Sequence, residues 1–406
     1  MKNPLDDYLQ QALNNINDEN GWDLSCLLSY SKSSSKYLNK FILKVQNLKD
    51  YLSYHIPEPW NEIIYLHLNI LLINDKDHSA LSRAQNTLTQ NFHAIFQNLS
   101  RWVLPVLYTL NHDLCNLSEL SDKQLKSNGE NPTYLEEATR TLNKAFSLCV
   151  NDRFSGIEES RKWGVYKIAN LLFRASFKLS QINLCTTILK LIASADLPAL
   201  EQYPKSDQVT FKYYTGVWSF YNENFVKACD DLMFALAHGS FSADKSTIPN
   251  KILTLRYLIP IQILHGRLPH PKLFQRYKTL KVYADIVESI KQGHLFLFDQ
   301  SLGKHQNTLI KWGTFLTLER ARLLVVRQLF RNMWMMSDRP SRMTVQMLAT
   351  GVRLSMHQTL SDPDQVCCLI VNCIDRGYLK GYLSHEKQTL VLKKGDPFPP
   401  ISGLSV

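Results

Sequence analysis

Apolar residues recur at helical spacing along most of the chain, up to about residue 360. The period is strongest between residues 133 and 192, where Leu142, Ala145, Phe146 and Cys149 share one predicted helix face. Polar segments rich in turn-forming residues, such as 122–132, separate these stretches and indicate loops. Helices joined by short polar connections predict antiparallel pairs that stack into a solenoid.

Residues 210–239 indicate the type of repeat. Four residues of this stretch fall at the small and close-packing positions of a tetratricopeptide-like helical hairpin: Gly216, Ala228, Leu232 and Ala235. Phe220 and Phe225 are expected to fill the space around the turn, but Lys212 stands where such repeats usually carry an aromatic residue. The match is partial, and a coincidental amphipathic pair of helices stays open as the alternative.

The pattern changes near the C-terminus. Residues 362–377 predict a helix with an acidic, proline-bearing first turn and a glycine just past its end. Residues 378–384 and 389–393 then predict two short strands around the polar turn 385–388. Helices closed by one small β-hairpin describe a winged helix, a module that binds nucleic acid or pairs with another subunit.

Further predicted elements lead into this ending. Residues 293–305 are expected to form a hairpin, 314–334 a long helix and 342–353 the middle helix of the winged helix. The long helix carries four arginines at positions expected to be polar: Arg320, Arg322, Arg327 and Arg331. The predicted fold class is therefore all-α, a tetratricopeptide-like helical-repeat superhelix followed by a C-terminal winged helix with a small β-hairpin.

The length of 406 residues exceeds what one hydrophobic core usually organises, so several packed units are expected. We predict an N-terminal helical-repeat region over residues 1–205. The helical part of a second domain is predicted over 206–312, its winged helix over 313–396 and a tail over 397–406.

The net charge of +10 is unevenly distributed. Residues 1–250 hold 24 Lys and Arg against 26 Asp and Glu, whereas residues 251–406 hold 22 against 10. All of the basic excess therefore belongs to the part that contains the winged helix. This asymmetry favours nucleic acid or an acidic peptide as a partner of the C-terminal part, and a solvated basic face without a ligand is the alternative.

No catalytic motif, metal-binding motif or cofactor-binding motif is found. The eight cysteines include no Cys-x-x-Cys, and Cys367, Cys368 and Cys373 have no histidine at ligand spacing, so we expect buried thiols and no metal. Phosphate loops, nucleophile elbows and His-Glu-x-x-His helices are absent, so neither a cofactor nor enzymatic activity is expected. The first residues show no signal peptide and no apolar run is long enough for a bilayer, which predicts a protein of the cytosol or nucleus without a membrane partner.

Clustered Lys and Arg in the winged helix are the candidates for contacts with nucleic-acid phosphates. The first group lies in the wing and its flank: Arg376, Lys380, Lys387, Lys393 and Lys394. Arg339, Arg342 and Arg353, around the middle helix, form a second group. Tyr378 and Tyr382 could stack on unpaired bases, but core packing is expected for at least one of them.

The predicted recognition helix lacks groups that read bases. Four of its apolar residues are instead predicted to form a partner interface: Val366, Leu369, Ile370 and Cys373. A helix that is apolar nearly all round is buried, and docking against another subunit would bury it. We therefore expect contacts to the nucleic-acid backbone without sequence readout.

Five segments of the chain resemble the PCI-domain subunit of the nuclear mRNA export complex (transcription-and-export complex two). PCI domains, helical repeats fused to a winged helix, are shared by the proteasome lid and the signalosome. The segments are 152–164, 210–216, 257–260 with 264–269, 380–385 (Lys-Gly-Tyr-Leu-Ser-His) and 396–400 (Asp-Pro-Phe-Pro-Pro). The resemblance covers roughly residues 90–400 and extends to the signalosome-subunit-twelve-like family.

The resemblance implies a non-enzymatic scaffold or adaptor in a hetero-oligomer. Its expected partners are a large PCI-type scaffold subunit, a small acidic disordered peptide of the proteasome-lid type, and RNA or DNA bound without strong sequence preference. Its expected location is the nucleus, at nuclear pores, with some protein in the cytoplasm. A basic and aromatic groove for the acidic peptide is predicted from Tyr257, Phe274, Tyr277 and Tyr283 together with the basic residues Arg256, Lys272, Arg276, Lys278 and Lys281.

A second hypothesis from another class stays open. The chain could be a structural subunit of a signalosome-like or lid-like assembly, with the winged helix used only for protein contacts. The basic wing separates the two hypotheses, because an assembly module needs no clustered lysines.

Overall fold

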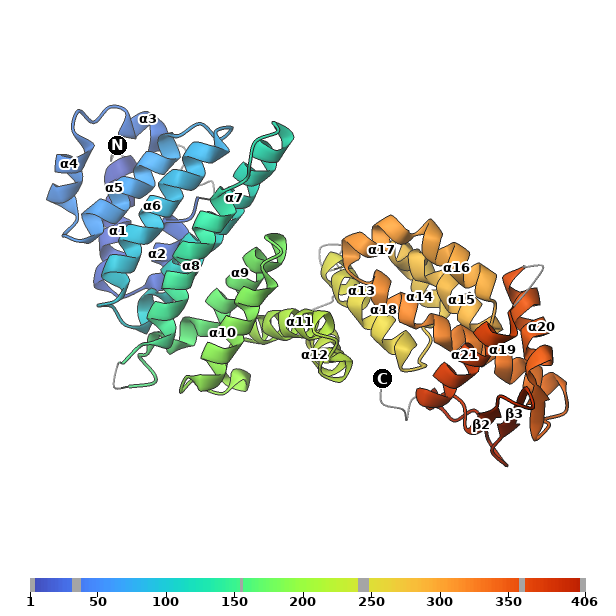
Figure 1. Cartoon of the computed structure of the whole chain (residues 1–406). Coiled ribbons are helices and arrows are strands. Elements are labelled where there is room, and N and C mark those ends of the chain that lie inside the picture. Colours follow the sequence, from blue (N-terminus) through green and yellow to red (C-terminus); the bar gives the residue numbers. More distant parts are fainter. Residues whose placement is uncertain (1–3, 31–37, 154–155, 240–247, 358–361, 402–406) are drawn as a thin grey trace. The chain divides into compact units, whose positions relative to one another are not determined.

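The computed structural model describes residues 4–30, 38–153, 156–239, 248–357 and 362–401 of the chain. The chain divides into two compact units, Met1–Tyr214 and Thr215–Val406, both built mainly of helices (Figure 1). The described C-terminal residues add one small sheet. The predicted all-α class with a terminal winged helix is thereby confirmed.

Unit 1 is a series of helices in which neighbours along the chain pack against each other, α6 with α7 and α7 with α8. Trp60 and Phe92 anchor its first half, with 6.2 Å between their ring centroids, and Trp102 lies 6.0 Å from Trp60. The helices are α1 Pro4–Asn17, α2 Gly21–Leu27, α3 Asn39–Ile42, α4 Leu48–His55, α5 Trp60–Leu72, α6 His78–Phe96, α7 Leu104–Ser127, α8 Tyr134–Val150, α9 Val165–Lys178 and α10 Ile182–Ser194, with α11 Lys205–Tyr221 crossing into unit 2.

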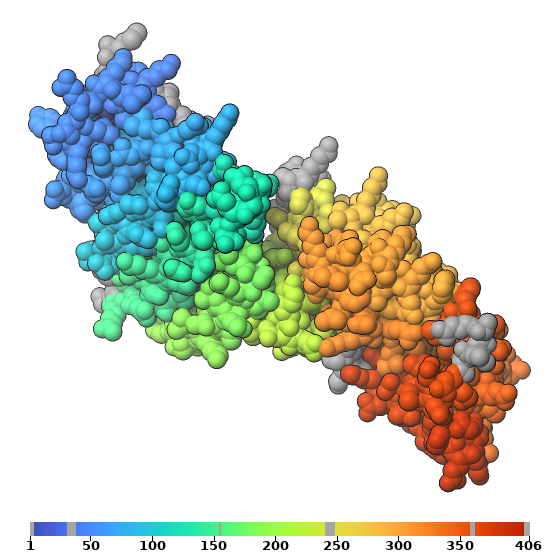
Figure 2. Space-filling model, turned by 45° about the horizontal axis from the view of Figure 1, so that its top comes forward, coloured from blue at the N-terminus to red at the C-terminus, as the bar shows by residue number. Residues whose placement is uncertain are grey.

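Unit 2 begins with a helical array and ends with the winged helix. The array consists of α12 Phe225–His238, α13 Ile248–Leu264, α14 Pro271–Arg276, the 3-10 helix Lys278–Tyr283, α15 Ala284–Gln292, α16 Leu295–Lys304, α17 Gln306–Trp312 and α18 Phe315–Arg320. The winged helix consists of α19 Arg322–Met336, β1 Arg342–Thr344, α20 Val345–Met356, α21 Pro363–Asp375, β2 Gly381–Ser384 and β3 Thr389–Leu392. It forms one end of unit 2, coloured from orange to red in Figure 2.

The predicted small-residue positions of the repeat pack as expected. Gly216 lies so close to α12 that a Cβ atom there would come within 2.8 Å of Leu232 Cγ. Ala228 and Ala235 are buried on the same helix, and the Phe220 and Phe225 rings lie 5.8 Å apart at the turn. The two helices therefore form the close hairpin that the spacing predicts.

The predicted loop 122–132 is helical up to Ser127. Asp122 faces inward, where its carboxylate accepts hydrogen bonds from the N–H groups of Tyr134 (2.9 Å) and Leu135 (3.0 Å). Acidic residues that cap a helix are usually found in loops, but Asp122 caps α8 from within α7. The polar composition of residues 122–132 therefore led to a wrong prediction of where α7 ends.

Two other predicted elements, both in unit 2, differ from the observed structure. The long helix 314–334 is broken at the buried Ala321, where tight turns link α18 to α19: the Ala321 N–H donates to the Leu318 carbonyl and the Leu324 N–H to the Ala321 carbonyl, each at 2.9 Å. The predicted hairpin 293–305 is instead the single helix α16, whose start is capped by His294 Nδ1 accepting from the Leu297 N–H at 3.2 Å.

The wing contains three strands where the sequence predicted two. The first three residues of the predicted middle helix, 342–344, form the strand β1 instead, and the helix starts after them. The strand order in the sheet is β1-β3-β2, and both pairings are antiparallel. Strand β2 begins only at Gly381, because Gly377 adopts a left-handed conformation (φ 71°) and the Leu379 N–H still donates to the Cys373 carbonyl at the end of α21.

Candidate nucleic-acid and partner-binding surfaces

The outward face of the three-stranded sheet is polar and basic. In the register of the sheet, Tyr382 pairs with Val391, which pairs with Arg342 on the other side, so these three residues point to one face. Alternation adds Lys380 and Lys393 to that face, and the Lys393 N–H donates to the Lys380 carbonyl at 3.0 Å. The opposite face carries the buried Met343, Leu390 and Leu392. The sheet thus brings three cations from three strand segments onto one exposed face.

Sequence reasoning placed Arg342 in a helix and so missed its position beside Lys380 and Lys393. The alternation Arg342-Met343-Thr344, with only the methionine buried, is the strand signal that could have revealed it.

The two tyrosines of the wing have different roles. Tyr378 is buried, whereas Tyr382 is 63% exposed on the basic face. Core packing for one of the two is therefore confirmed, and Tyr382 is placed where an unpaired base could stack on it.

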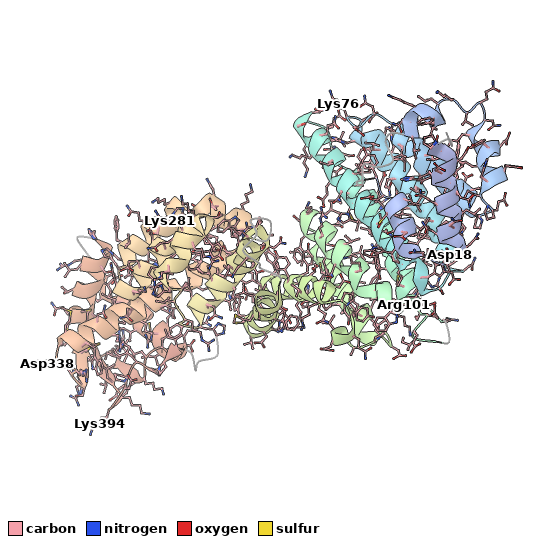
Figure 3. All side chains as sticks on the ribbon, turned by 180° about the vertical axis from the view of Figure 1, so that it is seen from behind. Asp18, Lys76, Arg101, Lys281, Asp338 and Lys394 are labelled. Atoms are coloured by element: carbon pink, nitrogen blue, oxygen red, sulfur yellow. The ribbon has the colours of Figure 1, made fainter. Side chains whose placement is uncertain are left out.

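The remaining residues predicted to contact phosphates lie outside this basic face, at separate places. Lys387 lies in the β2–β3 turn, Lys394 follows β3, and the exposed Arg339 follows Asp338 in the segment between α19 and β1; Lys394 and Asp338 are labelled in Figure 3. Arg339 lies 5.8 Å from the centre of the Trp334 ring. Arg353 is exposed in the last turn of α20, and Arg376 ends α21, both outside the sheet.

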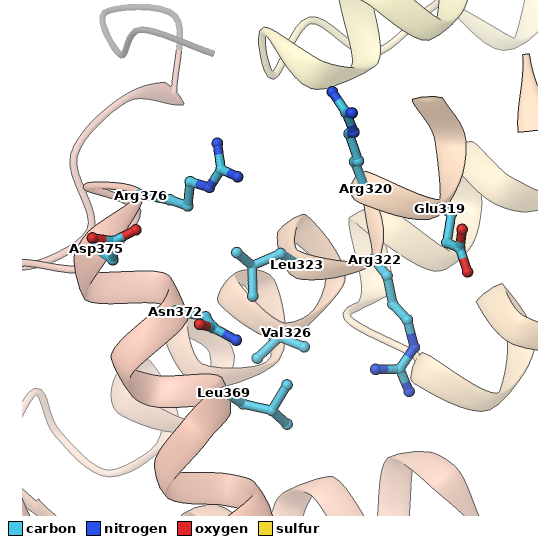
Figure 4. A pocket seen from close by; sticks show the side chains of 9 residues that line it. All are labelled: Glu319, Arg320, Arg322, Leu323, Val326, Leu369, Asn372, Asp375 and Arg376. Carbon is cyan, nitrogen blue, oxygen red and sulfur yellow. The ribbon is translucent and has the colours of Figure 1, made fainter. Parts of the chain in front are cut away.

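Arg376 lines a pocket of about 380 Å³ between α18, α19 and α21 (Figure 4). Leu323, Val326 and Leu369 form its apolar part. Its charged rim consists of Glu319, Arg320, Arg322, Asp375 and Arg376, with Asn372 beside them. Arg322 is held by the Asp299 carboxylate through two hydrogen bonds of 2.9 and 3.0 Å, and Arg320 pairs with Glu223.

The predicted partner interface on α21 is narrowed to one of its four residues. Val366, Ile370 and Cys373 are buried in the core of the winged helix, with at most 1% of each residue exposed, so none of the three can contact another subunit. Leu369 is partly exposed and lines the pocket of Figure 4. The sequence pattern did not distinguish an intramolecular core from a subunit interface, because both require apolar residues.

Arg327, predicted to be on the polar side of its helix, is buried. Its guanidinium donates to the backbone carbonyls of Phe398 (3.2 Å) and Pro399 (2.7 Å), and burial lowers its pKa. The Phe398 ring also packs 5.7 Å from Trp334. The Asp-Pro-Phe-Pro-Pro segment is therefore bound to the winged helix through backbone carbonyl groups that accept hydrogen bonds from Arg327.

The prediction of an aromatic groove for the acidic peptide is wrong. Tyr257, Phe274, Tyr277 and Tyr283 are all buried, at most 9% exposed, because they fill the core between α13, α14 and the following turn. Arg256 is partly buried and lies 4.6 Å from the centre of the Trp312 ring. The other four basic residues are exposed, namely Lys272, Arg276, Lys278 and Lys281, and Lys281 lies away from Asp338 and Lys394 (Figure 3).

In unit 1, the segment 152–164 is organised by a buried ion pair. Arg161 donates to Asp152 Oδ1 from Nη2 (2.6 Å) and Nε (3.1 Å), and to the Phe96 carbonyl from Nη1 (2.9 Å). Burial alone would raise the pKa of the Asp152 carboxyl, but hydrogen bonds from Arg161 and Ser160 outweigh burial and lower this pKa. This segment therefore has a structural role.

Cys368 is exposed, contrary to the expectation of buried thiols, whereas Cys115, Cys149 and Cys373 are buried and do not have the environment of nucleophiles. Burial raises the pKa of Cys115 and of Cys373 to about 12, and it also raises the pKa of Cys149. A thiol of this kind is protonated at neutral pH and reacts slowly. Within the described ranges, none of the helices combines the length and the apolar character needed to cross a membrane.

Helical repeats that end in a three-stranded winged helix define the class of PCI-domain proteins. In agreement, residues 302–394 match the family model of the PCI domain.

Relatives extend the similarity over the whole chain. The chain is 30% identical to PCI domain-containing protein 2 of Xenopus laevis, over 98% of both chains. It is 34% identical to the protein CSN12 homolog of Mycosarcoma maydis, over 80% of this chain and 76% of the relative. It is 31% identical to enhanced ethylene response protein 5 of Arabidopsis thaliana, over 76% and 72%. The chain belongs to the family of PCI domain-containing protein 2 and CSN12 homologues.

Proposed function

We propose that this protein is a non-catalytic scaffold subunit of a signalosome-type assembly, in which its PCI domain pairs with the PCI domain of another subunit. Membership in the family of CSN12 homologues supports the type of assembly. The observation that carries the proposal is the pocket between α18, α19 and α21. It has an apolar part around Leu369 and a charged rim, which is the anatomy of a protein interface.

The pocket suits a large apolar side chain of the partner. Leu323, Val326 and Leu369 would surround that side chain, while Arg376 and Asp375 at the rim would pair with polar groups around it. Arg320 and Arg322 are already paired with carboxylates of this chain, so they shape the rim and present their remaining N–H groups.

Affinity purification of the tagged full-length protein from its native cells, with identification of its stable partners, tests this proposal. We expect a second PCI-domain subunit in the complex, and loss of that subunit when Leu369→Glu places a charge in the pocket. Leu354→Glu is the matched control, because Leu354 is 69% exposed on α20 and does not line this pocket. A protein that purifies alone, or that loses its partner equally in both variants, contradicts the proposal.

The second candidate is an adaptor of nuclear mRNA export that binds RNA or DNA jointly with a large PCI scaffold subunit, at nuclear pores. The basic outward face of the sheet supports it, since Arg342, Lys380 and Lys393 are exposed together with Tyr382. Exposed cations that meet phosphates give affinity without sequence preference, and stacking on a tyrosine adds preference for unpaired bases.

Charge reversal of Lys380, Lys387, Lys393 and Lys394 to Glu in the purified complex separates the two candidates. The export adaptor requires a loss of RNA affinity of at least about tenfold and a smaller salt dependence, since phosphate contacts set the slope. The same number of reversals at Lys227, Lys291, Lys304 and Lys311, exposed cations outside the wing, is the control for net charge. Unchanged RNA affinity in the wing variant would leave only the assembly role.

A small acidic, disordered peptide of the proteasome-lid type is part of the same proposal. The exposed Lys272, Arg276, Lys278 and Lys281 on α14 and the turn after it support this, because clustered cations attract an acidic chain. Reversal of these four cations to Glu should release this peptide while the PCI partner stays bound. We propose a nuclear location for the assembled complex, with some protein in the cytoplasm.

A further inference from the structure

One group of potential metal ligands is found in the described residues, on the side of the winged helix where α21 meets the β2–β3 turn. One ligand atom each of Asp364, Cys367 and His385 lies within 4.8 Å of the others. A carboxylate, a thiol and an imidazole come together here from two different elements. This group lies outside the pocket of Figure 4 and has no part in the function proposed above.

The local fold explains why these three residues meet. The Asp362 carboxylate accepts from the Asp364 N–H at 3.0 Å and starts α21, and Pro363 follows it in the first turn. Asp364 and Cys367 are separated by one helical turn and therefore share a helix face. The burial of Val366 and Ile370 fixes the rotation of this helix, so that face is held toward the turn.

The β2–β3 turn supplies the histidine. Gln388 adopts a left-handed conformation (φ 44°), and its N–H closes the turn on the His385 carbonyl at 3.1 Å. The Gln388 carbonyl accepts from the Val345 N–H at 2.8 Å, which ties the turn to the start of α20. The Gln388 side chain spans the gap, with its Oε1 3.7 Å from Cys367 Sγ and its Nε2 3.2 Å from His385 Nδ1.

We propose that Asp364, Cys367 and His385 bind a thiophilic divalent cation, with Zn²⁺ as the expected metal. Thiolate and imidazole ligands favour zinc over Mg²⁺ or Ca²⁺, which prefer oxygen. Ligands of a tetrahedral zinc ion lie about 3.3–3.8 Å apart, as follows from bond lengths of about 2.0–2.3 Å, so the cluster needs only side-chain rotations to close. Water or the Gln388 amide oxygen completes four-fold coordination.

Binding converts the Cys367 thiol to a thiolate and releases one proton to solvent, with no change in oxidation state. The Asp364 carboxylate and the Cys367 thiolate together balance the two charges of the cation. The bound ion would join α21 to the β2–β3 turn, and so hold this turn against the helix.

Titration of the full-length protein with Co²⁺, followed by competition with Zn²⁺, tests the proposal. We expect one equivalent of Co²⁺ to produce thiolate-to-metal charge-transfer absorption, which Zn²⁺ removes. Cys367→Ser should abolish the absorption. Cys368→Ser is the matched control, because Cys368 is the exposed neighbour on the same helix and is not in the cluster, and it should leave the absorption unchanged.

A second measurement keeps the test valid if Cys367→Ser disturbs folding, since Cys367 is largely buried. His385 and Asp364 are exposed, so His385→Gln and Asp364→Asn should fold normally and weaken Zn²⁺ binding at least about tenfold, the size typical for the loss of one ligand or its support. Zn²⁺ should raise the melting temperature of the parent protein but not of His385→Gln. Absent charge transfer, or equal loss in Cys368→Ser, overturns the proposal.

Discussion

The two units of this protein differ in net charge and in whether their charged residues are paired inside the unit or exposed. Unit 1 contains 22 Lys and Arg and 22 Asp and Glu, whereas unit 2 contains 24 against 14. Unit 1 buries a complete ion pair, Asp152 with Arg161, and two histidines, His67 and His93. Unit 2 buries Arg327 against carbonyl groups and exposes its remaining excess of cations on the wing and around α14.

This difference separates structural charge from binding charge. A charge that is compensated inside a unit stabilises or destabilises that unit, and it has no influence on partners. Uncompensated cations on an exposed face have little effect on stability, but they attract phosphates or acidic chains. Unit 1 is therefore expected to respond to substitutions mainly through stability, and the wing of unit 2 mainly through binding.

Removing one half of the buried ion pair should have the largest effect. Arg161→Ala removes the guanidinium that pairs with the buried Asp152 carboxylate, which then keeps only the hydrogen bonds from Ser160 Oγ and the residue-161 N–H. Removing one partner of a buried ion pair typically costs about 3–5 kcal/mol. Hydrogen exchange in α8 and α9 should rise strongly. Arg140→Ala is the control, because its pair with Glu136 is exposed and should cost less than about 1 kcal/mol. Similar rates of hydrogen exchange in both variants would mean that the buried ion pair contributes little to the stability of unit 1.

Arg327→Ala should have the next largest effect, in unit 2. The carbonyls of Phe398 and Pro399 lose their donor, and hydrogen bonds to a charged group contribute about 1.5–3 kcal/mol. We expect the tail to become sensitive to proteolysis while hydrogen exchange in unit 1 stays unchanged. Arg331→Ala, on the same helix, is the control, because Arg331 makes no hydrogen bond to the tail residues that the structure describes, 397–401. A tail that stays protected would show that Phe398 packing against Trp334 is sufficient.

Acid should destabilise unit 1 through its buried histidines. Burial lowers the pKa of His67 to about 4 and that of His93 to about 3. The unfolded chain therefore takes up these protons below pH 6.5 while the folded unit does not, so stability falls as the pH decreases from about 6.5 to about 4 for His67 and to about 3 for His93. The loss at pH 5 is about 2 kcal/mol for each histidine. Urea unfolding at pH 7 and pH 5 measures the effect, and His93→Leu should reduce it by about half; an unchanged difference would assign the acid sensitivity to other groups.

The smallest expected effect concerns the exposed tyrosine of the wing. Tyr382→Ala should weaken binding of single-stranded RNA by about fivefold to tenfold, near the lower end of the range for loss of one base-stacking platform. Duplex RNA should be bound almost as before, because its bases are not available for stacking. Fluorescence anisotropy measures both affinities, and Tyr382→Phe should behave like the parent protein. Equal weakening on both ligands would indicate a disturbed sheet.

The sequence revealed the winged helix because its signals are local. Pro363 and Asp364 mark a helix start, Gly377 its end, and the residues after it alternate toward a polar turn. The Gly216 hairpin was predictable for a similar reason, since only a small residue allows two helices to approach at that position. Element boundaries failed where a polar residue serves another element, as Asp122 does when it caps α8.

The candidate surfaces depended more on distant parts of the chain. Composition placed the basic excess in the C-terminal part, and this placement does not require a fold. It did not predict that Arg342 lies across the sheet from Tyr382, because a three-residue strand depends on the partner strand β3 for its formation. The prediction of an aromatic groove around Tyr283 was wrong for a related reason. The sequence shows aromatic residues next to basic ones, and this order of residues occurs both on binding surfaces and at the edge of a buried core.

By itself, the sequence determined the fold class, the winged-helix ending and the location of the charge, because helix periodicity, turn residues and charge counts are properties of neighbouring residues. Only the tertiary structure decided which of these residues face solvent. It buried Arg327, Val366, Ile370 and Cys373, exposed Tyr382, and brought His385 to Cys367. Burial and proximity depend on which elements pack together, and that depends on the whole chain.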